Sequence, residues 1–180
     1  MLINIHQIHN YKSEKYMTGS ISDKNFEKFI IKYKKNIINF NEWIEKYKLN
    51  KLKNEIALTF DDGLLCQYKL ALPILNKYNI EAGWGICSAP IENVPIFLEI
   101  YKHFQHLYFE NDNEFYNMFY NIILSNIDYK NYKKELNNIE NINNFLKNLK
   151  FYTFNDRKFR YLRDFMANTS DFEKIIKIMM

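Results

Sequence analysis

Asp61 and Asp62 are adjacent carboxylates at the end of an apolar run, and Gly63 follows them directly. The run at 56–60 reads Ile-Ala-Leu-Thr-Phe, which is typical of a strand buried on both faces of a sheet. Barrel and open α/β enzymes place their reactive groups at such strand ends. Because neighbouring side chains on extended backbone point in different directions, we expect one carboxylate to bind a cation and the other to accept a proton. Gly63 permits the tight turn that follows.

Asp-Asp-Gly is also a common turn sequence, so the neighbouring elements decide between an ordinary turn and a site. Residues 71–80 predict a short helix that ends at Asn79, and residues 82–87 predict a further strand. Strand, acidic turn, helix and strand form a βαβ unit, in which the acidic turn lies at a sheet end. This context favours a metal site.

The chain resembles the polysaccharide deacetylase family of metal-dependent carbohydrate esterases. Residues 59–63, Thr-Phe-Asp-Asp-Gly, match the family's first motif, and residues 72–80, Leu-Pro-Ile-Leu-Asn-Lys-Tyr-Asn-Ile, are similar to the segment that follows it. Three more segments are similar in order and spacing to the family's opening strand and first two helices: 3–6, 22–29 and 39–44. The resemblance covers residues 1–88 and corresponds to the amino-terminal part of the family.

The resemblance implies that Asp61 is the general base and that Asp62 is a metal ligand. The implied cofactor is a divalent metal, zinc or alternatively cobalt or nickel, and the implied substrate is an N-acetylated saccharide or sugar intermediate. A bound cation of this kind can lower the pKa of its water from about 15.7 to about 7, and a nearby carboxylate can then take the proton. The implied activity is a hydrolase that removes an acetyl or similar acyl group in carbohydrate metabolism.

The family's second motif, His-Ser/Thr-x-x-His, supplies two further metal ligands and has no counterpart in this chain. The four histidines of this chain form two pairs with a spacing of three, His6 with His9 and His103 with His106. His103 and His106 share a helical face and are candidate metal ligands. Because they alternate with aromatic and apolar residues, we expect hydrogen-bonded core or surface groups instead, and the same holds for His6 and His9. The metal site of this chain is thus expected to be incomplete.

The fold class indicated is α/β. Residues 1–90 are expected to form half of a deacetylase-type (β/α) barrel, and residues 91–180 an all-helical insertion or extension of the same domain. A half barrel leaves an unpaired sheet edge, so we expect the chain to be an amino-terminal piece of a longer protein or an early-terminated product. Strands are expected at 2–6, 37–38, 55–60 and 82–87, and helices at 23–35, 42–48, 66–78, 96–109, 114–125, 131–149, 156–166 and 170–180.

The amino-acid composition excludes some classes of protein but indicates no particular function. The formal net charge of +4 comes from lysines spread over every expected helix, and no nucleic-acid recognition motif is present, so we exclude nucleic acid as a partner. No apolar run approaches the roughly 20 residues of a membrane span, and the amino terminus has no signal-peptide pattern. The two cysteines are not in a Cys-x-x-Cys arrangement, which favours reduced thiols. We therefore expect a cytoplasmic protein acting on a sugar intermediate.

Three functions from different classes agree with these patterns to different degrees. The first is the metal-dependent deacetylase described above. The second is a catalytically inactive or truncated module that binds saccharide or takes part in assembly. The third, a phosphatase with an aspartate nucleophile, is the weakest, because that class places its carboxylates as Asp-x-Asp whereas Asp61 and Asp62 are adjacent.

Overall fold

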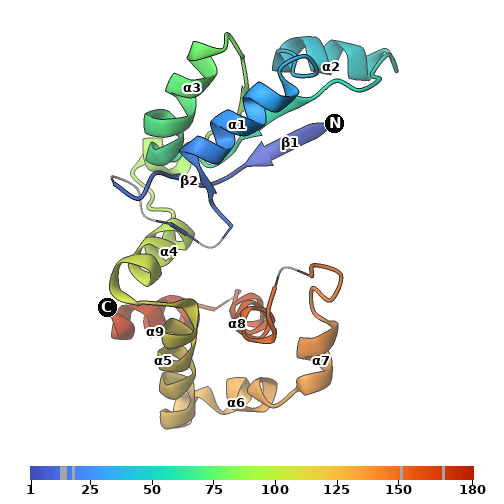
Figure 1. Cartoon of the computed structure of the whole chain (residues 1–180). Helices are drawn as coiled ribbons and strands as arrows, with labels where there is room; N and C mark the ends of the chain where they lie inside the picture. The colour runs from blue at the N-terminus through green and yellow to red at the C-terminus, as the bar shows by residue number, and fades with distance from the viewer. Residues whose placement is uncertain (13–15, 18, 151, 168) are drawn as a thin grey trace. The chain divides into compact units, whose positions relative to one another are not determined.

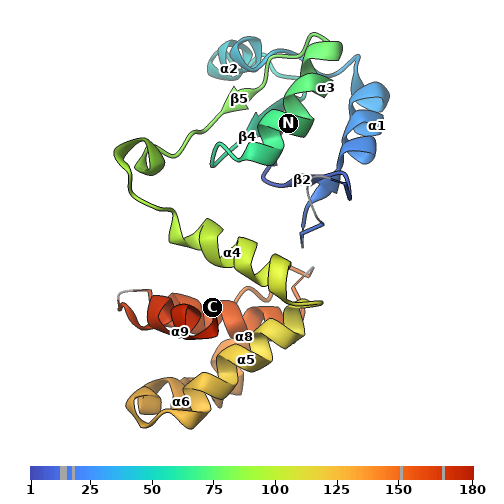
Figure 2. The same ribbon diagram turned by 90° about the vertical axis from the view of Figure 1, so that its left-hand side faces the viewer.

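The computed structural model describes residues 1–12, 16–17, 19–150, 152–167 and 169–180. The chain divides into two compact units, unit 1 (Met1–Pro95) and unit 2 (Ile96–Met180). Figure 1 labels their helices and some of their strands, and Figure 2 shows the same elements from the side. No helix in the described ranges combines the length and apolarity needed to cross a membrane.

Unit 1 contains a parallel sheet of β1 (Leu2–Ile5), β4 (Ala57–Phe60) and β5 (Gly83–Trp84), in the order β1-β4-β5. A second parallel pair, β2 (Ile8–His9) and β3 (Ile21–Ser22), follows β1 and was not expected. The architecture is therefore mixed α/β with a small parallel sheet. The described strands do not close into a barrel, so the half barrel stays a prediction.

Two expected strands are shorter than the sequence indicated. The strand at 82–87 is limited to β5, because the chain leaves the sheet after the Gly85 N–H donates to the Phe60 carbonyl at 2.7 Å. The strand at 37–38 is reduced to a single bridge between Ile37 and Ile56. A short apolar run fixes neither how far a strand extends nor how much of it is paired.

Helix α1 (Asp23–Tyr33) covers one face of the sheet. A serine directly before an apolar helical pattern predicts an N-cap, and the structure confirms it, since the Ser22 hydroxyl accepts the Asn25 N–H at 3.2 Å. Phe26 and Ile30, at helical spacing, are fully buried as core residues, and the Phe26 ring meets the Phe60 ring edge-on. Figure 1 shows α1 beside the strands, and α2 (Phe40–Lys48) follows it in the chain.

The helical segment expected at 66–78 has two parts. A π-helix, η1 (Gln67–Ala71), leads into α3 (Leu72–Lys77), which has Pro73 in its first turn. Proline has no N–H, so Pro73 cannot donate the hydrogen bond that a continuous α-helix would require at this position. A proline inside the expected helical segment predicts either a kink or the true start of the helix, and the structure has Pro73 in the first turn of α3.

A Schellman motif ends α3. Asn79 has a left-handed backbone with φ of 53°. The Ile80 N–H donates to the Leu75 carbonyl at 3.0 Å, and the Asn79 N–H donates to the Asn76 carbonyl at 3.2 Å. These bonds satisfy carbonyls that the helix end leaves free, and they confirm that the helix closes at Asn79.

Replacing Asn79 with alanine is expected to lower the free energy of unfolding of unit 1 by about 1 kcal/mol. The left-handed conformation costs roughly 1–2 kcal/mol for residues other than glycine, asparagine and aspartate. Asn79→Gly is the matched control and should leave stability unchanged or slightly higher. Urea unfolding followed by tryptophan fluorescence measures both variants, because Trp43 and Trp84 both lie in unit 1. Equal stability of Asn79→Ala and the parent would contradict this account.

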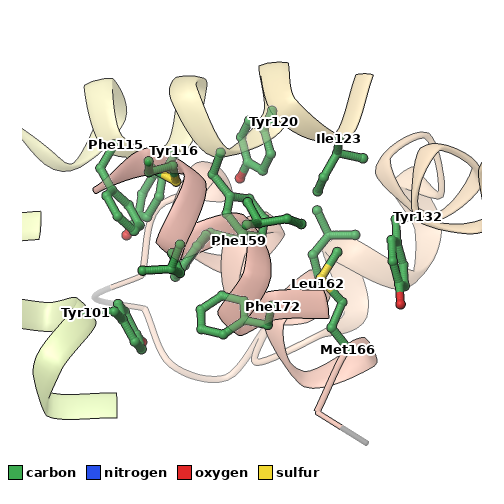
Figure 3. Close-up of a cluster of buried hydrophobic side chains, with 14 of the residues drawn as sticks. Tyr101, Phe115, Tyr116, Tyr120, Ile123, Tyr132, Phe159, Leu162, Met166 and Phe172 are labelled. Atoms are coloured by element: carbon green, nitrogen blue, oxygen red, sulfur yellow. The ribbon is translucent and has the colours of Figure 1, made fainter. Parts of the chain in front are cut away.

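Unit 2 is helical throughout its described residues. It contains α4 (Phe97–Tyr108), α5 (Asp112–Ser125), α6 (Lys130–Leu136), α7 (Ile139–Asn144), α8 (Phe154–Phe165) and α9 (Asp171–Met179), with the short 3₁₀ turn η3 (Ile127–Tyr129) before α6. Figure 3 shows its aromatic core, with the Phe159 ring among those of Phe115, Tyr116 and Phe172. Unit 2 therefore has a hydrophobic core of its own.

The single helix expected at 131–149 is wrong, because the structure breaks it into α6 and α7. The break falls at Asn137 and Asn138. The Asn138 side chain accepts the Asn141 N–H at 3.2 Å and so caps α7 as a separate helix. Asparagine side chains compete for backbone hydrogen bonds in this way, and the apolar spacing that predicted one helix does not register that competition.

Candidate metal centre

The candidate site lies on the face of the sheet that α1 does not cover. Side chains alternate along a strand, and the register pairs Asn4 on β1 with Thr59 on β4. His6 lies two residues after Asn4 and Asp61 lies two residues after Thr59, just beyond the ends of the two strands. The two side chains are therefore neighbours on this face. Asn4 and His6 are exposed and Thr59 is half-buried, so the expectation of burial on both faces does not hold here. The carboxyl end of the sheet presents polar side chains on an accessible surface.

Three potential ligand atoms converge at this end of the sheet. The Nδ1 atom of His6 lies 2.9 Å from Asp61 Oδ1 and 3.5 Å from Asp62 Oδ2. His6, Asp61 and Asp62 each offer one donor atom, and these atoms lie within 4.8 Å of one another. The two carboxylates were expected to point in different directions. They meet instead because Asp62 leaves the extended conformation, with a left-handed φ of 69°.

One oxygen of the Asp61 carboxylate accepts a hydrogen bond and the other accepts none. Asn4 Nδ2 donates to Asp61 Oδ2 at 3.1 Å, and the Asn4 Oδ1 atom accepts the Thr59 hydroxyl at 3.1 Å. Asp61 Oδ1 is shielded from solvent and has no hydrogen-bond partner among the described residues, and it lies 2.9 Å from His6 Nδ1, with which it forms an ion pair when the ring is protonated. Oδ1 is therefore the oxygen that can accept a proton or contact an ion.

Gln67 fixes the two strand ends relative to each other. Its side chain is fully buried, and Nε2 donates to the carbonyls of His6 and Asp61, both at 2.7 Å. Its Oε1 atom accepts the Leu64 N–H at 3.1 Å. One buried amide thus satisfies the backbone of β1, β4 and the turn together, and it positions the side chains that extend from them.

The turn itself follows the sequence expectation. Gly63 has φ of 67°, a left-handed conformation, and a Cβ at this position would lie 3.3 Å from Ile86 Cγ2. The turn borders an apolar cavity of about 290 Å³. The cavity is lined by Gly63 together with Leu64, Gln67, Tyr68, Leu72, Trp84 and Ile86. Apolar surface is therefore available next to the carboxylates.

The donor set fits a zinc-like cation. Imidazole nitrogen and carboxylate oxygen both bind Zn²⁺, at roughly 2.0–2.2 Å. Two such ligands on a tetrahedral ion lie roughly 3.3–3.6 Å apart. The distance of 3.5 Å between His6 Nδ1 and Asp62 Oδ2 falls in that range. Asp61 Oδ1, at the same place, has no hydrogen bond of its own and would be stabilised by a nearby positive charge.

The other histidines lie elsewhere. His9 is buried, its Nδ1 atom is 2.7 Å from the Ser20 hydroxyl, and its ring meets those of Tyr11 and Tyr16, so the hydrogen-bonded interpretation is confirmed for His9. His103 is exposed on α4, and burial lowers the pKa of the half-buried His106. Within the described ranges His103 and His106 join no group of three potential ligands, and their role as ligands stays a prediction.

Sequence reasoning did not single out His6 or Gln67. His6 meets Asp61 only through the pairing of β1 with β4, and no local pattern records that pairing. Gln67 had one weak signal, as a polar residue within the expected apolar helix that follows the acidic turn. Both residues are visible only once the sheet register is known.

No protein-family model and no curated protein matches the chain. Among solved structures it is similar to a de-N-acetylase from Aggregatibacter actinomycetemcomitans, with 21% sequence identity and a TM-score of 0.43. The similarity covers 53% of this chain and 40% of that one, so the chain spans less than half of its length. A similarity this distant does not establish function.

Proposed function

We propose that this chain carries the catalytic carboxylates of a metal-dependent hydrolase that removes an acetyl or similar acyl group from an N-acylated sugar. One observation carries the proposal. Asp61 and Asp62 lie at the carboxyl end of a parallel strand, and their oxygens converge with an imidazole within 4.8 Å. The resemblance of residues 59–63 to the first motif of the polysaccharide deacetylases supports the same chemistry.

Asp61 is the proposed general base. Its Oδ2 atom is held by Asn4, which fixes the orientation of the carboxylate, and its Oδ1 atom is left without a hydrogen bond. A base must offer a free lone pair at a fixed position to the water that attacks the acyl carbon. Oδ1 has no hydrogen bond and its position is fixed through Oδ2, so we assign the proton to this oxygen.

Asp62 is the proposed metal ligand. Its left-handed backbone turns the carboxylate back towards the strand ends, where Oδ2 lies 3.5 Å from the His6 ring. A bound Zn²⁺ or similar ion would supply a water of lowered pKa and would polarise the acyl oxygen. The protein's contribution is to hold Asp62 beside the base, so that ligand and base act on the same water.

Release of acetate tests the proposal. The natural gene product is incubated with Zn²⁺ or Co²⁺ and with chito-oligosaccharides or an N-acetylhexosamine sugar nucleotide, and free acetate is measured. We expect acetate release in the parent and in Glu45→Gln, which alters an exposed carboxylate on α2. Parent protein that folds, binds the ion and releases no acetate from any of these substrates would contradict the proposal.

A further inference from the structure

We propose that His6 is a metal ligand, and that it binds the same cation as Asp62 through Nδ1. The inference rests on the proposed function and adds the imidazole that follows β1 to the two carboxylates that follow β4. The chain lacks the His-Ser/Thr-x-x-His motif, so an imidazole supplied by the first strand would give the ion a nitrogen ligand from a different part of the fold.

The first argument is the arrangement of acceptor atoms. His6, Asp61 and Asp62 each offer one potential ligand atom, and these atoms lie within 4.8 Å of one another. Lone pairs that meet in this way repel unless a proton or a cation lies among them. A proton on Nδ1 would face Asp61 Oδ1 at 2.9 Å. A cation in its place would bind His6 Nδ1 and Asp62 Oδ2, with the base Asp61 beside it.

The second argument concerns the far side of the imidazole ring. His6 Nε2 lies 3.4 Å from Asn4 Nδ2, which is longer than the 3.1 Å bond from the same amide to Asp61. The amide nitrogen has two hydrogens, so it can donate to Nε2 as well as to Asp61 Oδ2, and Nε2 is then an acceptor. Nδ1, the nitrogen that faces Asp61 and Asp62, is therefore the one that an ion can reach.

Accessibility supports the same role. The His6 side chain is 58% exposed and the two aspartate side chains are each 36% exposed, so an ion can enter from solvent. The backbone beneath them is fixed by the buried amide of Gln67. A rigid base under accessible ligands is the arrangement that metal binding requires.

Titration with Co²⁺, followed by its visible absorption and by calorimetry, tests the inference without reference to catalysis. We expect one ion per chain in the parent. His6→Ala and His6→Asn should both weaken binding by roughly 10- to 100-fold or more, the loss seen even for supporting residues of metal sites. His6→Asn retains an N–H donor beside the carboxylates, so it separates metal ligation from hydrogen bonding. His103→Ala removes an exposed histidine elsewhere and should bind as the parent does.

The outcomes distinguish this inference from the proposed function. If His6→Asn binds Co²⁺ as tightly as the parent while Asp62→Asn does not, His6 is no ligand and the inference is overturned, although Asp62 keeps its proposed role. If the parent itself binds no ion, the inference is overturned as well. If the parent binds and both His6 variants lose affinity, the inference stands even where no acetate is released. Circular dichroism of each variant confirms that the exposed His6 position tolerates the change.

Discussion

Asp61→Asn is expected to lower kcat for acyl release by about 10²- to 10⁴-fold, the usual contribution of a positioned general base. Asparagine keeps the size of the side chain and can still occupy the place beside Asn4, but it cannot accept the proton of the attacking water. The Co²⁺ affinity of the variant should change far less than that of Asp62→Asn. Kinetics of acetate release and Co²⁺ titration on the same preparations measure both effects.

The two readouts separate the roles of the neighbouring carboxylates. Asp62→Asn should lose ion binding and activity together, whereas Asp61→Asn should lose activity alone. If Asp61→Asn loses Co²⁺ as completely as Asp62→Asn, then Asp61 is a ligand and the assignment of the base is wrong. Full activity in Asp61→Asn would exclude it from the chemistry altogether.

Gln67→Leu is expected to destabilise unit 1 by about 3 kcal/mol or more. The substitution leaves the carbonyls of His6 and Asp61 and the N–H of Leu64 without their buried partner, and each such loss costs roughly 1–3 kcal/mol. Asn76→Ala is the matched control, because it removes an exposed amide from α3. Urea unfolding followed by tryptophan fluorescence measures both variants.

Gln67→Leu should also weaken Co²⁺ binding, because the strand ends that carry His6 and Asp61 lose their common anchor. The loss should appear under conditions where the variant is still folded, as judged by circular dichroism. A Gln67→Leu protein with parental stability and parental ion affinity would show that the amide does not position the site.

Local sequence was enough to predict the acidic turn, the cap at Ser22 and the start of α3 at Pro73. Each depends on residues within a few positions of one another, and their backbone preferences act over that range. The sequence also indicated the α/β class, because a strand, a turn and a helix follow one another around Asp61. The assignment of Asp61 and Asp62 to base and ligand came from the family resemblance and stays a prediction.

The composition of the site could not be predicted in the same way. His6 reaches Asp61 through a parallel register between β1 and β4, and apolar runs do not specify register before the strands are paired. The direction of Asp62 depended on a left-handed backbone, which aspartate adopts only in some turns. The break between α6 and α7 was missed for a related reason, since apolar spacing carries no information about capping by Asn138.

His6 and Asp62 are 56 positions apart in the chain, and they belong to the ends of different strands. A cation held by both would tether those strand ends in the folded protein like a reversible crosslink. Ligands that bind only the folded state raise stability in proportion to the logarithm of their concentration. The melting temperature of unit 1 would then report the free zinc level of its surroundings.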